Sequence, residues 1–415
     1  MPDELIIKGE LAKKASYQLL SLDTDTKNRA LLNIADALEK NNKKIISANL
    51  IDLNNAKHKG TKQAMLDRLM LNEERIFAMA DGVRQVASLP DPIGEITEEW
   101  ERPNGLKIAK KRVPMGVIAI IYEARPNVTA DACALCLKTG NAVILRGGSE
   151  AINSNKAIMN IMQEAAYAYG IPEGSINLIE DTTREAAVGL MKLNGYVDML
   201  IPRGGQGLIK SVVENATVPI VETAAGNCHI YVDDECDFDM AEKIILNAKV
   251  SRPSVCNAVE TLLINEKIAK EFLPKICTSL SDNNVEIRGC EKSAGLLPYL
   301  KRADEDDWYT EYNDYIISVK IVEDIDEAIL HINKYNTGHS ESIITDNSAN
   351  AERFLNEVDA SAVYVNASTR FTDGFEFGFG AEIGISTQKM HARGPMGLKE
   401  LTTYKYIIRG NGQIR

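Results

Sequence analysis

The chain has 415 residues, of which 45% are hydrophobic and 26% are charged, a balance typical of a soluble globular protein with two or three domains. Its formal net charge of −12 argues against a general nucleic-acid-binding protein, because contacts to phosphates need a basic surface. The first residues lack the basic and apolar regions of a signal peptide, and no apolar run is long enough to span a membrane. We therefore expect a cytoplasmic protein.

The N-terminal part, from about residue 13 to residue 84, is predicted to be helical, because its apolar residues repeat at helical spacing. Thr24 or Asp25 is a candidate N-cap there. Alternation of strands and helices follows. The predicted strands are 116–122, 142–145, 175–179, 197–201 and 218–221, and the helices between them are 128–137, 155–169, 183–193 and 206–214. Continuous Val, Ile and Leu runs between helices are typical of a parallel sheet covered on both faces.

A second α/β set follows in the C-terminal half. Its predicted strands are 260–265, 285–288, 316–322, 342–345 and 362–365, with helices that include 267–280 and 326–334. Two other segments, 105–113 and 401–408, alternate apolar and polar residues, which indicates half-exposed antiparallel strands. Paired together, they form an arm whose free edges invite a partner subunit. The predicted fold class is α/β, with two parallel-sheet domains and a small β-arm for oligomerisation.

Cys256 is the most informative single residue. It lies in the segment 251–258, between a helix-like run and a strand-like run, so its thiol is predicted to lie on a loop. Arg252 is close in sequence and favours the thiolate, the nucleophilic form. Cys133 and Cys136, by contrast, lie on an apolar helix without nearby histidines, which favours core packing over redox or metal chemistry. We predict no metal site.

Polar residues and glycines follow several predicted strands, where α/β sheets usually bind their ligands. Asn127 either caps the next helix or donates a hydrogen bond to an oxyanion, and its spacing favours the cap. Arg146 and Ser149 either hold a phosphate or form an ordinary turn. Gly204 and Gly205 are placed to seat a diphosphate against a helix N-terminus.

Four more polar residues are candidates on weaker patterns. Glu222 ends an apolar run, and is a general base, a partner for an arginine, or a solvated carboxylate. Arg370 lies in a long loop rich in Gly and Phe and is a candidate for binding a substrate carboxylate. His339 and His391 occur in loop-like sequences, so a cysteine hydrolase or acyltransferase with a Cys–His dyad stays open, as does a binding protein with an inert Cys256.

Six segments in this order resemble one family over essentially the whole chain. They are 114–118, 122–129, 137–148, 251–257, 336–341 and 386–398. They are similar to γ-glutamyl phosphate reductases, a branch of the aldehyde dehydrogenase superfamily. The resemblance implies NADPH-dependent reduction of L-glutamyl 5-phosphate to L-glutamate 5-semialdehyde and phosphate, through a cysteine thioester, in proline biosynthesis. A hydrolytic NAD-dependent aldehyde dehydrogenase is the nearest alternative.

The resemblance also implies which parts of the chain form which domain. Residues 1–230 are expected to bind the cofactor, with 366–390 returning to that domain. Residues 231–365 form the catalytic domain, and 99–114 with 391–415 form the oligomerisation arm. The expected partners are the small-molecule substrate, further copies of the chain and glutamate 5-kinase.

Roles for single residues follow from the same resemblance. Cys256 falls on the nucleophile, Asn127 on the side-chain oxyanion donor, and Glu222 on the general base of hydrolytic members. The cofactor contacts fall on Arg146, Ser149, Gly204, Gly205 and Glu311. Ser149 replaces a carboxylate of many NAD-using relatives, which permits the 2′-phosphate of NADP. Arg125, Arg252 and Arg370 are the candidates for the substrate's phosphate and carboxylate.

Overall fold

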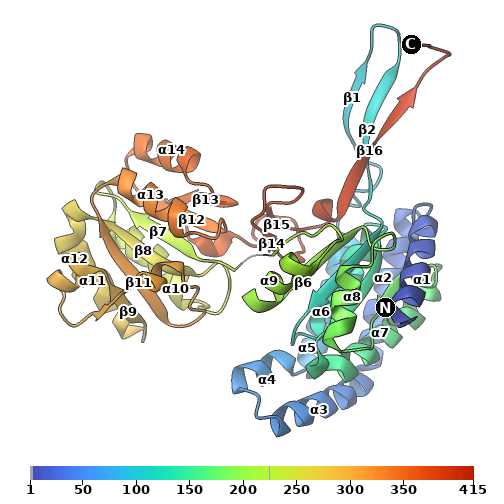
Figure 1. Ribbon diagram of the computed structural model, residues 1–415, viewed down its shortest axis with the longest axis horizontal. Coiled ribbons are helices and arrows are strands. Elements are labelled where there is room, and N and C mark those ends of the chain that lie inside the picture. Colours follow the sequence, from blue (N-terminus) through green and yellow to red (C-terminus); the bar gives the residue numbers. More distant parts are fainter. Residues whose placement is uncertain (1–2, 224) are drawn as a thin grey trace. The chain divides into compact units, whose positions relative to one another are not determined.

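The computed structural model describes residues 3–223 and 225–415, which form two compact units (Figure 1). Unit 1 contains the described chain up to Thr223 together with Gly378–Gly384 and Met396–Arg415. Unit 2 contains residues 225–377 and Ile385–Pro395. No helix in the described part of the chain is both long and apolar enough to cross a membrane.

Unit 1 begins with helices, as the sequence predicted. They are α1 (Asp3–Leu19), α2 (Thr24–Lys40), α3 (Asn42–His58), α4 (Gln63–Leu69) and α5 (Glu73–Ser88). The predicted N-caps Thr24 and Asp25 are wrong, since both lie inside α2. Asp23 caps this helix, because its carboxylate accepts a hydrogen bond from the backbone N–H of Thr26 at 2.7 Å.

A four-stranded parallel sheet in the order β5-β4-β3-β6 forms the core of unit 1. Its strands are β3 (Val117–Tyr122), β4 (Ala142–Gly147), β5 (Ile176–Leu178) and β6 (Met199–Arg203), and its helices are α6 (Asn127–Lys138), α7 (Ile152–Tyr167), α8 (Arg184–Met191) and α9 (Gln206–Asn215). All residues of β3 are buried, as expected for a strand covered on both faces. The predicted strand 218–221 is wrong. Only an isolated bridge from Ile220 to Leu200 forms there, since Pro219 has no N–H to donate to a ladder.

Unit 1 also carries a three-stranded antiparallel sheet in the order β1-β2-β16, which we call the arm (Figure 1). It consists of β1 (Ile96–Glu101), β2 (Lys107–Pro114) and β16 (Thr402–Arg409). The predicted pairing of 105–113 with 401–408 is confirmed by the register of β2 and β16. The sequence did not predict β1, because all of its residues are exposed and show no alternation in burial.

Unit 2 is built on a seven-stranded parallel sheet in the order β10-β9-β11-β8-β7-β12-β13. The strands are β7 (Cys228–Val232), β8 (Val259–Asn265), β9 (Glu286–Gly289), β10 (Lys301–Arg302), β11 (Ile316–Val322), β12 (Ser340–Ile344) and β13 (Ala362–Val365). The helices are α10 (Phe238–Val250), α11 (Glu266–Asp282), α12 (Glu291–Leu296), α13 (Ile325–Tyr335) and α14 (Ser348–Glu357). The short strands β14 (Ile385–Ser386) and β15 (Gly394–Pro395) pair with each other.

The C-terminal segments return to unit 1 over shorter stretches than the sequence predicted. Of the residues 366–390, only Gly378–Gly384 lie in unit 1. The loop around Thr369 stays in unit 2 because the hydroxyl of Thr369 donates a hydrogen bond to the carbonyl of Asn257 at 2.7 Å. The Asn257 amide in turn donates to the carbonyl of Thr372 at 3.0 Å.

Candidate functional site

Cys256 lies on the loop between α10 and β8, as predicted, and its side chain is half-buried. The two ends of this loop are joined by an ion pair between Lys249 and Glu260, whose Nζ and Oε2 atoms are 2.5 Å apart. Both side chains are fully buried. The pair ties the end of α10 to the start of β8 and so holds the loop that carries the thiol.

The backbone of Gly226 packs directly against the Cys256 loop. A Cβ atom placed on Gly226 would lie 1.4 Å from the carbonyl oxygen of Cys256, so only glycine fits there. The same carbonyl accepts a hydrogen bond from the Cys228 thiol at 3.2 Å. On its other side, the Gly226 N–H donates to the Glu311 carboxylate at 2.8 Å. Sequence reasoning gave no role to Gly226, because the strand β7 that follows it was not predicted.

We expect the substitution Gly226→Ala to slow alkylation of Cys256 by iodoacetamide about tenfold or more, because the added methyl group displaces the loop by more than an ångström. Peptide mass spectrometry of the alkylated Cys256 measures this rate. Gly295→Ala is the matched control in the same unit, since nothing lies within 4 Å of a Cβ there. Equal alkylation rates in both variants and the unaltered chain would contradict this interpretation of the packing.

Two arginines lie near the thiol in unit 2. The Arg370 guanidinium donates to the side chains of Asn257 and Ser251 and interacts electrostatically with Arg252 and with Cys256. Burial lowers the pKa of Arg370, and the neighbouring Arg252 lowers it further. The structure thus brings Arg370 together with Arg252 and Cys256, which the sequence had already placed in one segment. The positive charge of Arg370 near a half-buried sulfur favours the thiolate.

The candidate histidines have different surroundings. His339 is fully buried, and its Nδ1 lies 2.8 Å from Ser340 Oγ and 3.8 Å from Cys228 Sγ. Burial lowers the pKa of His339 to about 4, so the imidazole is neutral at pH 7. His391 is exposed, with a left-handed backbone, between β14 and β15.

Asn127 does not cap a helix, so the interpretation that its spacing favoured is wrong. It is the first residue of α6, the N-cap is Pro126, and the cap makes no side-chain hydrogen bond. The exposed side chain of Asn127 instead donates through Nδ2 to Asp131 Oδ2 at 2.9 Å. Its alternative role as an oxyanion donor stays a prediction.

The corner before Asn127 has a strained backbone. Ala124 has a φ of 40°, a left-handed conformation that is unusual for a residue with a Cβ atom. The Glu150 carboxylate accepts a hydrogen bond from the Ala124 N–H at 2.6 Å and holds this conformation. Arg125 follows with an exposed side chain.

Arg146 and Ser149 lie at the carboxyl end of β4 but differ in exposure. The Nη2 of Arg146 donates to the carbonyls of Thr182 and Thr183, at 2.6 and 3.1 Å, and burial lowers the pKa of this guanidinium. Ser149 is exposed and begins the short 3₁₀ helix η1 (Ser149–Ala151). Of the two, Ser149 is therefore the residue that unit 1 presents to solvent.

The glycine turn after β6 already holds an anion. Gly205 is the N-cap of α9, and its N–H donates to the Glu123 carboxylate at 2.9 Å. A Cβ atom on Gly204 would lie 2.5 Å from that carboxylate. This helix N-terminus can therefore bind negative charge. Glu222 lies further along unit 1 and is half-buried.

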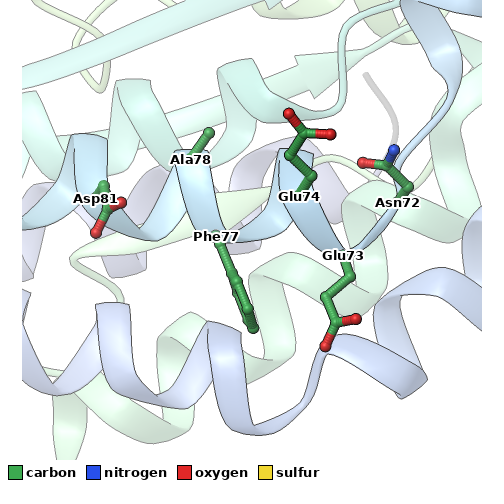
Figure 2. Close-up of a pocket in the computed structure, with 6 residues that line it drawn as sticks. All are labelled: Asn72, Glu73, Glu74, Phe77, Ala78 and Asp81. Carbon is green, nitrogen blue, oxygen red and sulfur yellow. The ribbon is translucent and has the colours of Figure 1, made fainter.

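A surface hollow on α5 contains none of the predicted site residues. It is lined by Asn72, Glu73, Glu74, Phe77, Ala78 and Asp81. Figure 2 shows that the side chains of Glu73 and Phe77 point to one side of the helix and that of Glu74 to the other. Three carboxylates without a lysine or arginine make this hollow unsuitable for a phosphorylated ligand. Among the described residues, no group of three or more His, Cys, Asp or Glu side chains is placed to hold a metal ion.

Comparison with known proteins covers almost the entire chain. The sequence model described as "Aldehyde dehydrogenase family" matches residues 8–292 and 308–407. A γ-glutamyl phosphate reductase from Caldanaerobacter subterraneus subsp. tengcongensis is 63% identical, over 99% of this chain and 100% of the relative. One from Clostridium botulinum is 64% identical with the same coverage. The crystal structure of γ-glutamyl phosphate reductase from Thermotoga maritima matches with a TM-score of 0.98 and 52% identity, over 99% of this chain and 100% of that one.

Proposed function

This chain belongs to the γ-glutamyl phosphate reductase branch of the aldehyde dehydrogenase family, and we propose that it reduces L-glutamyl 5-phosphate to L-glutamate 5-semialdehyde and phosphate with NADPH, in proline biosynthesis. The observation that carries the proposal is the half-buried Cys256 on its loop, with Arg252 and Arg370 close by. An acyl phosphate is an activated electrophile, and a thiolate beside two cations is suited to attack it.

In this mechanism the Cys256 thiolate attacks the carbonyl carbon of the acyl phosphate. The new C–S bond forms, the C–O bond to phosphate breaks with its electrons, and phosphate leaves from a thioester. The side chain of Asn127 and the backbone N–H of Cys256 donate to the oxyanion, each worth about 3 kcal/mol. The thioester carbonyl then accepts a hydride, which NADPH would supply when bound. The resulting thiohemiacetal then expels Cys256 as a thiolate and gives the aldehyde.

The residues of unit 1 fit a dinucleotide phosphate. The N-terminus of α9 at Gly205 holds the Glu123 carboxylate, which a bound phosphate would replace, and Gly204 allows an anion to approach its backbone closely. Ser149 is exposed and uncharged, so it does not repel a 2′-phosphate, and Arg146 is the neighbouring cation. We assign the nicotinamide ribose to Glu311, whose carboxylate accepts from Gly226 beside the cysteine loop.

The arginines supply the positive charge that this substrate needs. The net charge of the chain is −12, so a phosphorylated amino acid requires local cations to offset it. We assign this role to Arg125, Arg252 and Arg370. Reduction needs no activated water, so Glu222 handles protons or supports the structure in this direction.

The arm is proposed to join copies of the chain in a cytoplasmic homo-oligomer. Its strand β16 exposes Tyr404, Tyr406 and Ile408, and large apolar side chains in a row on an edge strand favour burial against another subunit. Glutamate 5-kinase, which makes the unstable acyl phosphate, is the further partner that we propose.

The experiment that tests the proposed function is oxidation of glutamate 5-semialdehyde in the reverse direction. We expect the rate to require inorganic phosphate and to be higher with NADP than with NAD, as followed by absorbance of the reduced nicotinamide. Oxidation that is independent of phosphate and yields glutamate would instead identify a hydrolytic aldehyde dehydrogenase. Cleavage of the acyl phosphate without any nicotinamide consumption would identify a hydrolase or acyltransferase.

A further inference from the structure

We infer that Asp131 is a positioning residue that orients the side-chain amide of Asn127 toward the oxyanion of the acyl group. The inference rests on the proposed function, in which Asn127 is an oxyanion donor. The inference adds to that function, because it identifies the residue that turns the N–H of the Asn127 amide toward the oxyanion. An asparagine amide presents either an N–H or a carbonyl oxygen, and only the N–H stabilises a negative charge.

The hydrogen bond that carries the inference runs along one helical turn. Asn127 and Asp131 are four residues apart on α6, so their side chains share one face of the helix. Nδ2 of Asn127 lies 2.9 Å from Oδ2 of Asp131. An ionised carboxylate only accepts hydrogen bonds, so it pairs with the amide nitrogen and not with the amide oxygen. This pairing uses one N–H of Asn127 and leaves the second for a ligand.

Other groups hold the backbone around Asn127. Asp131 therefore affects only the side-chain torsion angles of Asn127. Pro126 occupies the N-cap with a φ of −58°, and the strained Ala124 is held by Glu150. Without an acceptor at Asp131, the Asn127 amide can rotate by half a turn and present its oxygen. An oxygen at that place repels the developing oxyanion.

The surroundings of Asp131 keep it an acceptor at neutral pH. Its side chain is half-buried and lies close to α5, since a Cβ atom added to Gly82 of that helix would be 3.9 Å from Oδ1 of Asp131. Burial raises the pKa of Asp131 to about 6, while the hydrogen bond from Asn127 and the charge of Arg203 oppose the rise. Cys133 on α6 also interacts with this carboxyl group. Below pH 6 the protonated group becomes a donor, which favours the amide oxygen of Asn127 instead.

The test compares Asp131→Leu and Asp131→Asn in the full chain. We expect Asp131→Leu to lower kcat for acyl-phosphate reduction about tenfold or more, approaching the loss caused by removing an oxyanion donor, with the Kd for NADPH changed by less than about twofold. Asp131→Asn offers both a carbonyl acceptor and an N–H₂ donor and so orients the Asn127 amide only in part, and we expect its kcat at pH 7.5 to lie between those of the unaltered chain and Asp131→Leu. Its pH profile should lack the fall of kcat near pH 6 that the carboxyl group contributes.

A double variant separates positioning from a structural role. In an Asn127→Ala background, Asp131→Leu should cause no further loss of kcat, because there is no amide left to orient. An equal loss in both backgrounds would overturn the inference, as would a normal kcat for Asp131→Leu. If Asp131→Leu does not fold, the Asp131→Asn profile decides, and an unchanged fall near pH 6 refutes the inference. Absence of reductase activity in the unaltered chain would instead refute the proposed function itself.

Discussion

Replacement of Cys256 by serine is expected to lower kcat for acyl-phosphate reduction by about 10³-fold or more, because a serine hydroxyl is a far weaker nucleophile than a thiolate at neutral pH. The fold and the affinity for NADPH should not change, since the thiol is only half-buried and the phosphates of the dinucleotide are assigned to residues of unit 1. Steady-state kinetics and fluorescence titration with NADPH measure these two effects.

Cys290→Ser is the control for this substitution. Cys290 is also half-buried in unit 2, but it lies outside the loop and contacts the Ser293 hydroxyl at 3.1 Å. A serine there keeps the hydrogen bond, so we expect a nearly normal kcat. A Cys256→Ser variant that turns over at a rate comparable to the control would exclude a covalent thioester.

The second large effect concerns stability. Removing one partner of the buried pair, by Lys249→Met or Glu260→Leu, is expected to reduce the free energy of unfolding by about 3–5 kcal/mol. The reason is that the remaining charged group is left fully buried without its counter-charge. Burial already raises the pKa of Glu260 and lowers that of Lys249, and their mutual attraction opposes both changes. Urea unfolding followed by circular dichroism measures the loss.

The double variant Lys249→Met/Glu260→Leu tests the same explanation by removing both charges. With both groups replaced, no buried charge remains, so we expect most of the lost stability to return. Glu357→Gln is the surface control, because the Arg353–Glu357 pair is exposed and its loss should change the free energy of unfolding far less than loss of the buried pair. Additive losses in the double variant would contradict a direct interaction between Lys249 and Glu260.

Most strands of both parallel sheets were predictable from the sequence because they contain apolar runs, and β3 and β8 are buried along their whole length. β7 and the exposed two-residue strand β10 were not predicted. β11 and β13 begin and end where they were predicted. The arm strand β1 was not predictable, since its exposed residues carry no burial pattern. The run 218–221 has strand composition, but its proline prevents a regular ladder. Periodicity reports burial and does not report whether a neighbouring strand is present to pair.

The residues of the candidate site were predictable as types, whereas their hydrogen bonds were not. The sequence placed Cys256 on a loop and named Arg252 and Arg370, but only the fold shows that these two arginines lie together. The contact of Asn127 with Asp131 has ordinary helical spacing, so capping was the favoured interpretation until the N-cap was seen to be Pro126. A hydrogen bond between side chains that forms in only one rotamer cannot be predicted from a single sequence.

Mass spectrometry can detect the covalent bond between the acyl group and Cys256 on which the proposed mechanism depends. Chain incubated with an acyl phosphate and no NADPH should gain the mass of one acyl group, on the peptide that contains Cys256, and should lose it when NADPH is added. No adduct on Cys256 in chain that is shown to reduce the same acyl phosphate, or an adduct that NADPH does not remove, would contradict the account.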